Sequence, residues 1–152
     1  LEIVAGLQIS NIFISNPEIR KSFVRALSRT GYSSPNMMGI YAAQAAYRFG
    51  RPWLEALKAY LSENLDFVRN FVKEELPGIH LVEPEGTYLV WLDCRDLGYS
   101  DGELNEKVLN QAKLWLDGGS MFGGEGEGFQ RINIACPRSV LKEALMRFKN
   151  IL

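Results

Sequence analysis

Arg131 is the residue of this chain whose type and position most directly suggest chemistry. In residues 130–134, Ile132 and Ile134 alternate with Arg131 and Asn133, so a strand here would place the isoleucines on one face and the polar pair on the other. An arginine among apolar residues is costly to bury unless an anion meets it. Its planar fork can hold a carboxylate through two parallel hydrogen bonds. Two interpretations remain open: a carboxylate-binding arginine, or an edge-strand arginine that is solvated or held in a structural ion pair.

A glycine-rich segment from Gly118 to Gly128 precedes this strand. A phosphate-binding loop leads from a strand into a helix, whereas here Glu125 and Glu127 would repel a phosphate and a strand follows. We therefore expect the segment around Phe122 to be a mobile loop that borders a pocket, with an ordinary hairpin excursion as the equal alternative.

Two polar clusters could contact a ligand. Tyr32, Ser34 and Asn36 come just before a predicted helix, and the N-terminus of a helix accepts anions, although capping alone explains these residues equally well. Thr87 follows Glu85 at the start of a predicted strand, where its hydroxyl could reach a ligand or belong to a plain turn.

His80 and the two cysteines do not assemble a recognisable metal or nucleophile site. The chain has one histidine, and Cys94 and Cys136 lie far apart in sequence, so no zinc site, disulfide framework or Cys-His centre is predicted. His80 is expected to be structural. Both cysteines are expected to be buried free thiols in a reducing compartment, which predicts a cytoplasmic protein.

The composition is that of a soluble globular protein, with 152 residues, 47% hydrophobic and 23% charged residues, and a net charge of −1. This balance predicts no binding to nucleic acid or to an anionic membrane. No apolar run is long enough to span a membrane and no signal peptide opens the chain. Because the first residue is leucine, we expect a processed chain or a piece of a longer one.

The hydrophobic pattern predicts an α+β fold. Residues 6–15 are rich in β-branched residues and are expected to form a strand. The remaining predicted elements are helices over 17–29 and 37–49, a long amphipathic helix from 54 to 75, strands over 79–83 and 87–93 joined by a tight turn at 84–86, a helix after a capping box at Ser100, a short strand at 113–116, a strand at 129–135 and a final helix capped by Ser139.

Gly50-Arg51-Pro52 is the expected domain boundary. Residues 1–50 would then form a strand-helix-helix unit. Residues 51–152 would form a domain of order αββαββα with a small, mainly antiparallel sheet.

In their order, these segments resemble the C-terminal part of fold-type I pyridoxal-phosphate (PLP) enzymes of the aminotransferase class I/II group. The branch they resemble is the cystathionine β-lyase (cysteine-S-conjugate β-lyase, MalY/PatB) type. The resemblance covers essentially the whole chain and is carried by AGLQISNIFISNPEIRK, GYSSPNMMGIYAAQAAYRFG, PEGTYLVWLD, LDGGSMFG and GFQRINIACPRSVLKEAL. It implies that residues 1–50 are the C-terminal remnant of the large PLP-binding domain and that 51–152 are the small, substrate-closing domain.

The resemblance also implies site residues for an amino-acid substrate. Arg131 would bind the α-carboxylate with Asn133 beside it, and Thr87 and Phe122 would border the substrate.

Tyr32, Ser34 and Asn36 would approach the cofactor site of a neighbouring subunit, which implies a homodimer.

The parent enzyme would be a C–S β-lyase acting on cysteine S-conjugates or cystathionine. It would withdraw the α-proton, with PLP as the electron sink, before a thiolate leaves. A PLP-dependent aminotransferase is the alternative, because it uses the same carboxylate clamp.

The chain departs from the family at the lysine that forms the Schiff base with PLP. That lysine lies a few residues before the AGLQ motif, which places it immediately before residue 1, and no lysine of this chain has a matching context. The chain as given is therefore expected to bind no PLP alone and not to catalyse. A hypothesis of another class is a non-catalytic module that is truncated or dimerises.

Overall fold

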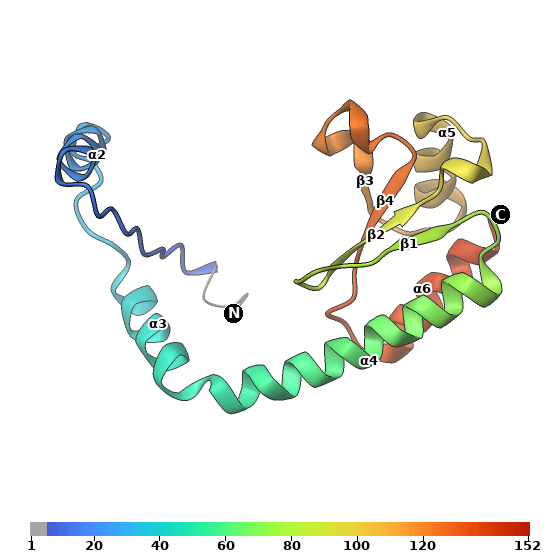
Figure 1. Ribbon diagram of the computed structural model, residues 1–152, viewed down its shortest axis with the longest axis horizontal. Coiled ribbons are helices and arrows are strands. Elements are labelled where there is room, and N and C mark those ends of the chain that lie inside the picture. The colour runs from blue at the N-terminus through green and yellow to red at the C-terminus, as the bar shows by residue number, and fades with distance from the viewer. Residues whose placement is uncertain (1–5) are drawn as a thin grey trace. The chain divides into compact units, whose positions relative to one another are not determined.

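The computed structural model describes residues 6–152, which form two compact units divided between Ala56 and Leu57. Figure 1 shows the elements of each unit along the chain. The first unit contains α2 (Pro17–Arg29), α3 (Met37–Phe49) and the beginning of α4 (Arg51–Glu75). The second contains the rest of α4, a four-stranded sheet and the helices that follow.

Helices α2 and α3 each begin after an asparagine that caps the first turn. The Asn16 side chain accepts hydrogen bonds from the backbone N–H groups of Glu18 and Ile19 at 2.9 and 3.2 Å. Asn36 accepts one from Met38 at 3.0 Å. Each cap satisfies an N–H group that the first helical turn leaves without a partner, so both predicted helices are confirmed.

The strand expected over residues 6–15 is wrong, because residues 9–15 are irregular. A strand needs a neighbour to pair with its backbone, and no described residue pairs with this segment. Phe13 is 92% exposed, and Gly39 is the one buried residue described between 6 and 56. The first unit therefore presents apolar side chains without a core of its own.

The second unit has the predicted order αββαββα. Its sheet has the order β1-β2-β4-β3, and all neighbouring strands are antiparallel. Its elements are β1 (His80–Val82), β2 (Leu89–Asp93), α5 (Asp101–Glu106) continued by a π-helical turn (Lys107–Gln111), β3 (Asp117–Gly118), β4 (Phe129–Asn133) and α6 (Arg138–Lys149).

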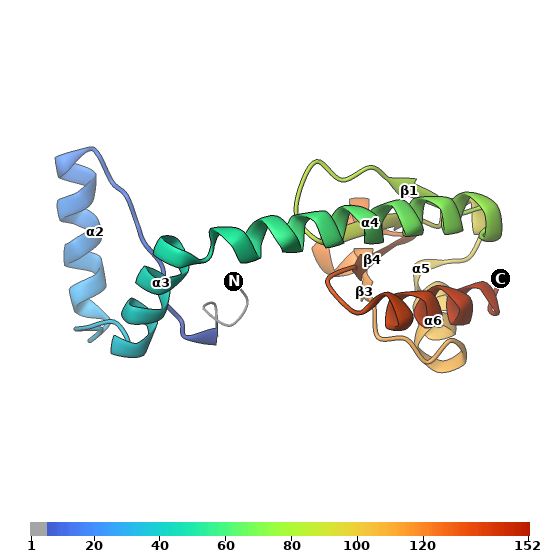
Figure 2. The same cartoon turned by 90° about the horizontal axis from the view of Figure 1, so that it is seen from below.

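The core lies between one face of this sheet and the helices. Val90 and Ile132 point from β2 and β4 into a cluster that also contains Val68 of α4 and Phe148 of α6. The buried Asn64 of α4 donates a hydrogen bond of 2.7 Å to the carbonyl oxygen of Ile134. Figure 2 shows α6 running beside the second half of α4. The other face of the sheet is left to carry polar and aromatic side chains.

Three local predictions in this unit need correction. The connection between β1 and β2 is a longer loop, residues 83–88, because both strands are shorter than expected. The short strand expected at 113–116 is wrong: Lys113 has a φ of 56°, and pairing with β4 begins only at Asp117. Ser139 does not cap α6, which begins after Pro137 without a side-chain cap. The capping box at Ser100 is confirmed.

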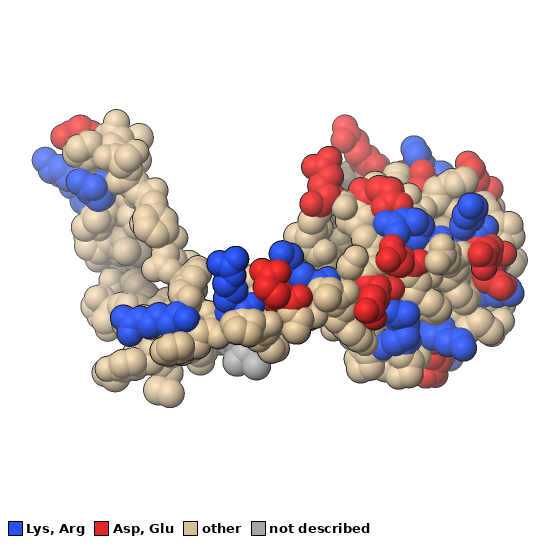
Figure 3. All heavy atoms as spheres, turned by 60° about the horizontal axis from the view of Figure 1, so that its bottom comes forward, with Lys and Arg blue, Asp and Glu red and all other residues tan. Residues whose placement is uncertain are grey.

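Charged side chains of both signs are interspersed over residues 57–152 on the face shown in Figure 3. Within residues 6–152, no helix is long and apolar enough to cross a membrane. The same residues contain no group of three or more potential metal ligands.

Candidate functional site

Arg131 lies on the face of the sheet opposite the core. Ile132 and Ile134 are buried, as the alternation predicts, and Arg131 projects from the other side of β4. In the antiparallel register Arg131 pairs with Trp91 on β2 and with Asp117 on β3. Residues directly opposite each other in adjacent strands have neighbouring side chains. The fold therefore sets an arginine between an aromatic ring and a carboxylate.

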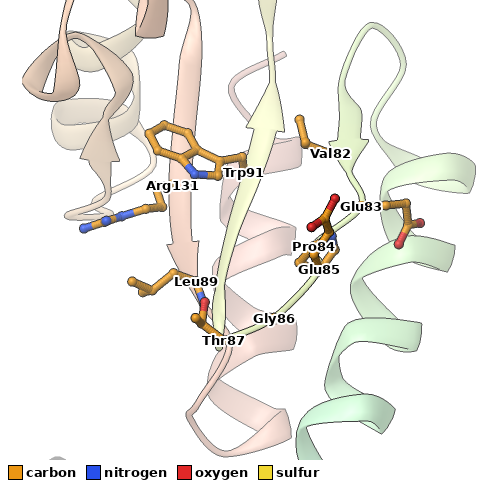
Figure 4. A pocket seen from close by; sticks show the side chains of 9 residues that line it. All are labelled: Val82, Glu83, Pro84, Glu85, Gly86, Thr87, Leu89, Trp91 and Arg131. Carbon is orange, nitrogen blue, oxygen red and sulfur yellow. The ribbon is translucent and has the colours of Figure 1, made fainter. Parts of the chain in front are cut away.

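A pocket of about 440 Å³ lies at this face, between β1, β2 and the loop that joins them. Figure 4 shows that its polar side chains come from β4 and from the loop, and that Trp91 and Leu89 come from β2. The pocket is lined by Val82, Glu83, Pro84, Glu85, Gly86, Thr87, Leu89, Trp91 and Arg131. Leu89 and Trp91 supply apolar side chains to this pocket, and Glu85, Thr87 and Arg131 supply polar ones, a combination that small-molecule sites also use.

The Arg131 guanidinium is held by an ion pair and by aromatic rings. Its Nε and Nη2 donate hydrogen bonds of 3.1 and 2.7 Å to the same oxygen of Asp117. Its carbon Cζ lies 4.4 Å from the ring centroid of Phe122 and 5.9 Å from that of Trp91. The side chain is 24% exposed. The side chain is thus largely shielded from water, and a charge-assisted contact is stronger away from bulk water than in it.

Phe122 reaches Arg131 from the glycine-rich segment between β3 and β4. That segment forms two 3₁₀ turns, Gly119–Phe122 and Gly124–Gly126. Its backbone crosses itself so closely that a Cβ on Gly119 would lie 1.9 Å from the carbonyl oxygen of Gly126. The glycines are required for this crossing, and the crossing brings the Phe122 ring to the sheet.

Thr87 lines the pocket in an unusual backbone conformation. Its φ is 68°, which is rare and costly for a β-branched residue. Its hydroxyl oxygen accepts a hydrogen bond from the backbone N–H of Leu89 at 3.2 Å. Such conformations cluster at ligand sites, so this residue stays a candidate for substrate contact.

The loop that carries Thr87 is attached to α4 through Glu83. The Arg69 guanidinium donates to both carboxylate oxygens of Glu83, at 2.8 and 2.9 Å, and also contacts Asp66. These hydrogen bonds hold the pKa of Glu83 below its usual value and raise the pKa of Arg69. The ion pair anchors one wall of the pocket.

Asn133 shares the face of Arg131 but is not among the residues that line the pocket. Its side-chain oxygen accepts a hydrogen bond from the backbone N–H of Ala135 at 2.8 Å. In this structure Asn133 therefore stabilises the chain where it leaves β4.

Tyr32, Ser34 and Asn36 lie together in the connection between α2 and α3, and all three are exposed. Asn36 also donates from its amide nitrogen to the carbonyl oxygen of Leu7 at 3.4 Å. They belong to the first unit, whereas Arg131, Thr87 and Phe122 belong to the second.

His80 and the cysteines stand apart from the pocket. His80 Nε2 lies 2.8 Å from a carboxylate oxygen of Asp96. The two residues are 16 positions apart in sequence, and folding brings them together. Both cysteines are free; Cys94 is buried and Cys136 is partly buried. Burial raises the pKa of Cys94 to about 12, so neither its position nor its ionisation suits a nucleophile.

Sequence reasoning did not single out Asp117 or Trp91. Trp91 could have been found, because alternation along Leu89–Asp93 places Leu89 and Trp91 on one face. Asp117 could not, because its pairing with Arg131 depends on where the edge strand begins.

Comparison with known proteins gives a consistent result, although no family model matches the chain. The chain is 38% identical over 146 residues to cystathionine beta-lyase PatB of Bacillus subtilis, covering 96% of this chain and 38% of that protein. It is 38% identical over 133 residues to protein MalY of Escherichia coli, covering 87% of this chain and 34% of that protein. Two aminotransferases among the curated relatives align with 74% of this chain.

A solved relative has the same fold over nearly the whole chain. The PLP-containing crystal structure of cystalysin from Treponema denticola superposes with a TM-score of 0.93 at 34% identity, covering 97% of this chain and 37% of that one. The chain thus spans between a third and two fifths of the length of these relatives. By sequence and by fold, the chain belongs to the fold-type I PLP-dependent family of the cystathionine β-lyase (MalY/PatB) type, of which it represents a C-terminal portion.

Proposed function

We propose that this chain is the substrate-binding C-terminal part of a PLP-dependent C–S β-lyase that acts on cystathionine or other S-substituted cysteines. The observation that carries the proposal is the position of Arg131, which lines the pocket with a side chain that is 24% exposed. A fork fixed in this way suits the planar α-carboxylate of an amino acid. Fixing the carboxylate also fixes the orientation of the bonds at Cα.

The apolar part of the pocket would contact the sulfur substituent of the substrate. Val82, Leu89 and Trp91 line it together with Arg131. Thr87 and Phe122 would border the bound amino acid, while Asn133 would support the strand that carries Arg131.

The proposal assigns residues 1–50 to a large cofactor-binding domain and residues 51–152 to a small substrate-closing domain. Support for the first assignment comes from the exposed apolar side chains of that unit, among them Phe13, Tyr47 and Phe49. Tyr32, Ser34 and Asn36 would contribute to the cofactor site of a neighbouring subunit in a homodimer. Their common position in one exposed connection is compatible with that role.

The described residues fit the amino acid better than they fit PLP. No residue that lines the pocket is a lysine, so this pocket offers no amine for a covalent link to the cofactor. The residues of this chain therefore act in binding and orientation, and the cofactor chemistry is assigned to other parts of the enzyme.

Lyase activity is favoured over transamination because the lyases PatB and MalY align with more of this chain than the curated aminotransferases do. The carboxylate clamp would serve both reactions, so Arg131 does not separate them.

The test uses the complete polypeptide in which this chain occurs, purified with PLP and supplied with L-cystathionine. The proposal predicts stoichiometric pyruvate, ammonia and homocysteine in the absence of a 2-oxo acid. Turnover that requires an added 2-oxo acid, with the amino group transferred to it and no thiol released, would assign the chain to an aminotransferase instead. No turnover of any S-substituted cysteine would contradict the proposal.

A further inference from the structure

We infer that Asp117 is a positioning residue, which turns one particular edge of the Arg131 fork toward the substrate. The inference rests on the proposed function and adds to it a residue that does not itself touch the substrate. It is based on which N–H groups of the Arg131 guanidinium donate hydrogen bonds within the protein and which remain available to a ligand.

The two hydrogen bonds from Arg131 to Asp117 occupy one side of the guanidinium. Nε and Nη2 donate to Oδ2 of Asp117 at 3.1 and 2.7 Å. A guanidinium has five N–H donors in a fixed plane. One hydrogen of Nη2 and both hydrogens of Nη1 remain, because within residues 6–152 Arg131 donates side-chain hydrogen bonds from Nε and Nη2 and not from Nη1. The remaining Nη2 hydrogen and one of the Nη1 hydrogens form the end edge of the fork, which can bind a carboxylate with two parallel bonds.

Two aromatic rings lie beside the same fork. The Phe122 ring centroid lies 4.4 Å from Cζ of Arg131, and Trp91 lies at 5.9 Å. Asp117 therefore restrains the rotation of the fork through two hydrogen bonds, while the Phe122 ring packs against the guanidinium. Together they leave the end edge as the part of the cation that can meet a ligand.

Asp117 is itself well placed to act as a fixed support. It pairs directly with Arg131 in the register of β3 and β4. The next residue, Gly118, is buried against Asn105, whose Oδ1 would lie 2.5 Å from a Cβ at that position. Asn105 is bonded in turn to the buried Gln130 of β4 at 2.7 Å. The short edge strand is thus held on the side opposite the pocket.

The charge of Asp117 works against its geometric effect, because a second carboxylate near Arg131 repels the substrate carboxylate. An alanine variant removes both effects at once and does not separate them. Asparagine removes the charge but keeps an oxygen that accepts from Nε and Nη2. Comparing Asp117→Ala with Asp117→Asn therefore isolates the orientation of the fork.

The experiment measures kcat and KM for L-cystathionine in the complete polypeptide. Hydrogen bonds to a charged group are stronger than neutral ones, so we expect KM for Asp117→Ala to exceed that for Asp117→Asn by about tenfold. We expect KM for Asp117→Asn to equal that of the unmodified enzyme or to be lower. The repulsion between the two carboxylates is lost in this variant, while the orientation of the Arg131 fork is kept. Asp117→Val, which also lacks an acceptor and suits a strand, takes the place of Asp117→Ala if the latter does not fold.

A second comparison distinguishes positioning from general stabilisation. In an Arg131→Lys background there is no fork to orient, so the difference between Ala and Asn at position 117 should shrink to less than about twofold. Equal KM values for the two variants in the unmodified background, or the same ratio in both backgrounds, would overturn the inference. If Arg131→Lys itself leaves KM unchanged, the proposed function fails; if it raises KM while Ala and Asn at 117 behave alike, only the inference fails.

Discussion

The Phe122 ring meets the Trp91 ring edge to face, with centroids 5.2 Å apart and an interplanar angle of 79°. Phe122 comes from the glycine-rich segment, whereas Trp91 comes from the sheet. Aromatic pairs in this geometry stabilise contacts beyond the area that they bury. The contact therefore ties the position of the glycine-rich segment to the surface that carries Arg131.

Gly119→Ala is expected to displace this segment. A Cβ at this position would lie 1.9 Å from the carbonyl oxygen of Gly126, so the two 3₁₀ turns cannot keep their crossing. We expect a loss of about 1–3 kcal/mol in the free energy of unfolding, measured by urea titration.

Gly124→Ala is the matched control, because a Cβ there has no neighbouring atom within 4 Å among the described residues. Its free energy of unfolding should stay within about 0.5 kcal/mol of the unmodified protein. Equal effects of the two substitutions would show that the backbone crossing does not limit the sequence here.

Phe148→Ala tests the core beneath the sheet. Phe148 is 1% exposed, and its removal should destabilise the protein by about 3–5 kcal/mol in urea unfolding. Val140→Ala on the same helix is the control, because Val140 is 53% exposed and should change stability by less than about 0.5 kcal/mol. A small effect of Phe148→Ala would contradict the assigned core.

The pKa of Glu83 is expected to depend on Arg69. The hydrogen bonds from Arg69 hold the pKa of Glu83 below its ordinary value of 4.5 in the folded protein. The ion pair between Arg69 and Glu83 therefore stabilises the folded protein above about pH 4.5. This stabilisation is lost as the pH falls through the lower pKa that Glu83 has in the folded state. In Arg69→Gln, an NMR titration should show the Glu83 pKa rising toward its ordinary value.

Glu103 provides the internal control for that titration. Its pKa is lowered by hydrogen bonds from the Ser100 side chain and backbone, which Arg69 does not touch. The Glu103 pKa should therefore stay where it is in Arg69→Gln. A shift of both carboxylates, or of neither, would contradict the specific pairing of Arg69 with Glu83.

The two cysteines should differ in reactivity toward a thiol reagent at pH 8. Burial raises the pKa of Cys94 to about 12 and also raises that of the less buried Cys136. The thiolate is the reactive form, so Cys136 should react first and Cys94 only after unfolding. Cys136→Ser should abolish the reaction in the native state; fast labelling of that variant would contradict the burial of Cys94.

Local signals in the sequence predicted most elements of the fold. Asn16 and Asn36 mark helix starts because a side-chain oxygen next to a proline or an apolar run has a purely local effect. Ser100 and Glu103 did the same through a capping box. The element order αββαββα follows from the changes in hydrophobic period along residues 51–152, although the third strand lies at Asp117–Gly118 and not at 113–116.

Features that depend on distant partners were not predictable in this way. Residues 6–15 have strand-forming side chains, but a strand forms only beside another strand, and none of the described residues supplies one. Asp117 pairs with Arg131 because β3 begins after the left-handed Lys113. Alternation places Arg131 on the polar face and leaves a structural ion pair open as one interpretation, whereas the identity of its partner, Asp117, depends on the tertiary fold.

The most direct test of the account is the KM of Arg131→Lys for L-cystathionine in the complete polypeptide, compared with Arg147→Lys. Arg147 is an ion-paired arginine on the surface of α6, so its replacement should leave KM unchanged. Because a lysine ammonium cannot replace two parallel hydrogen bonds, the Arg131 variant should raise KM by about 10- to 100-fold. An unchanged KM in Arg131→Lys would contradict the assignment of Arg131 as the carboxylate-binding residue.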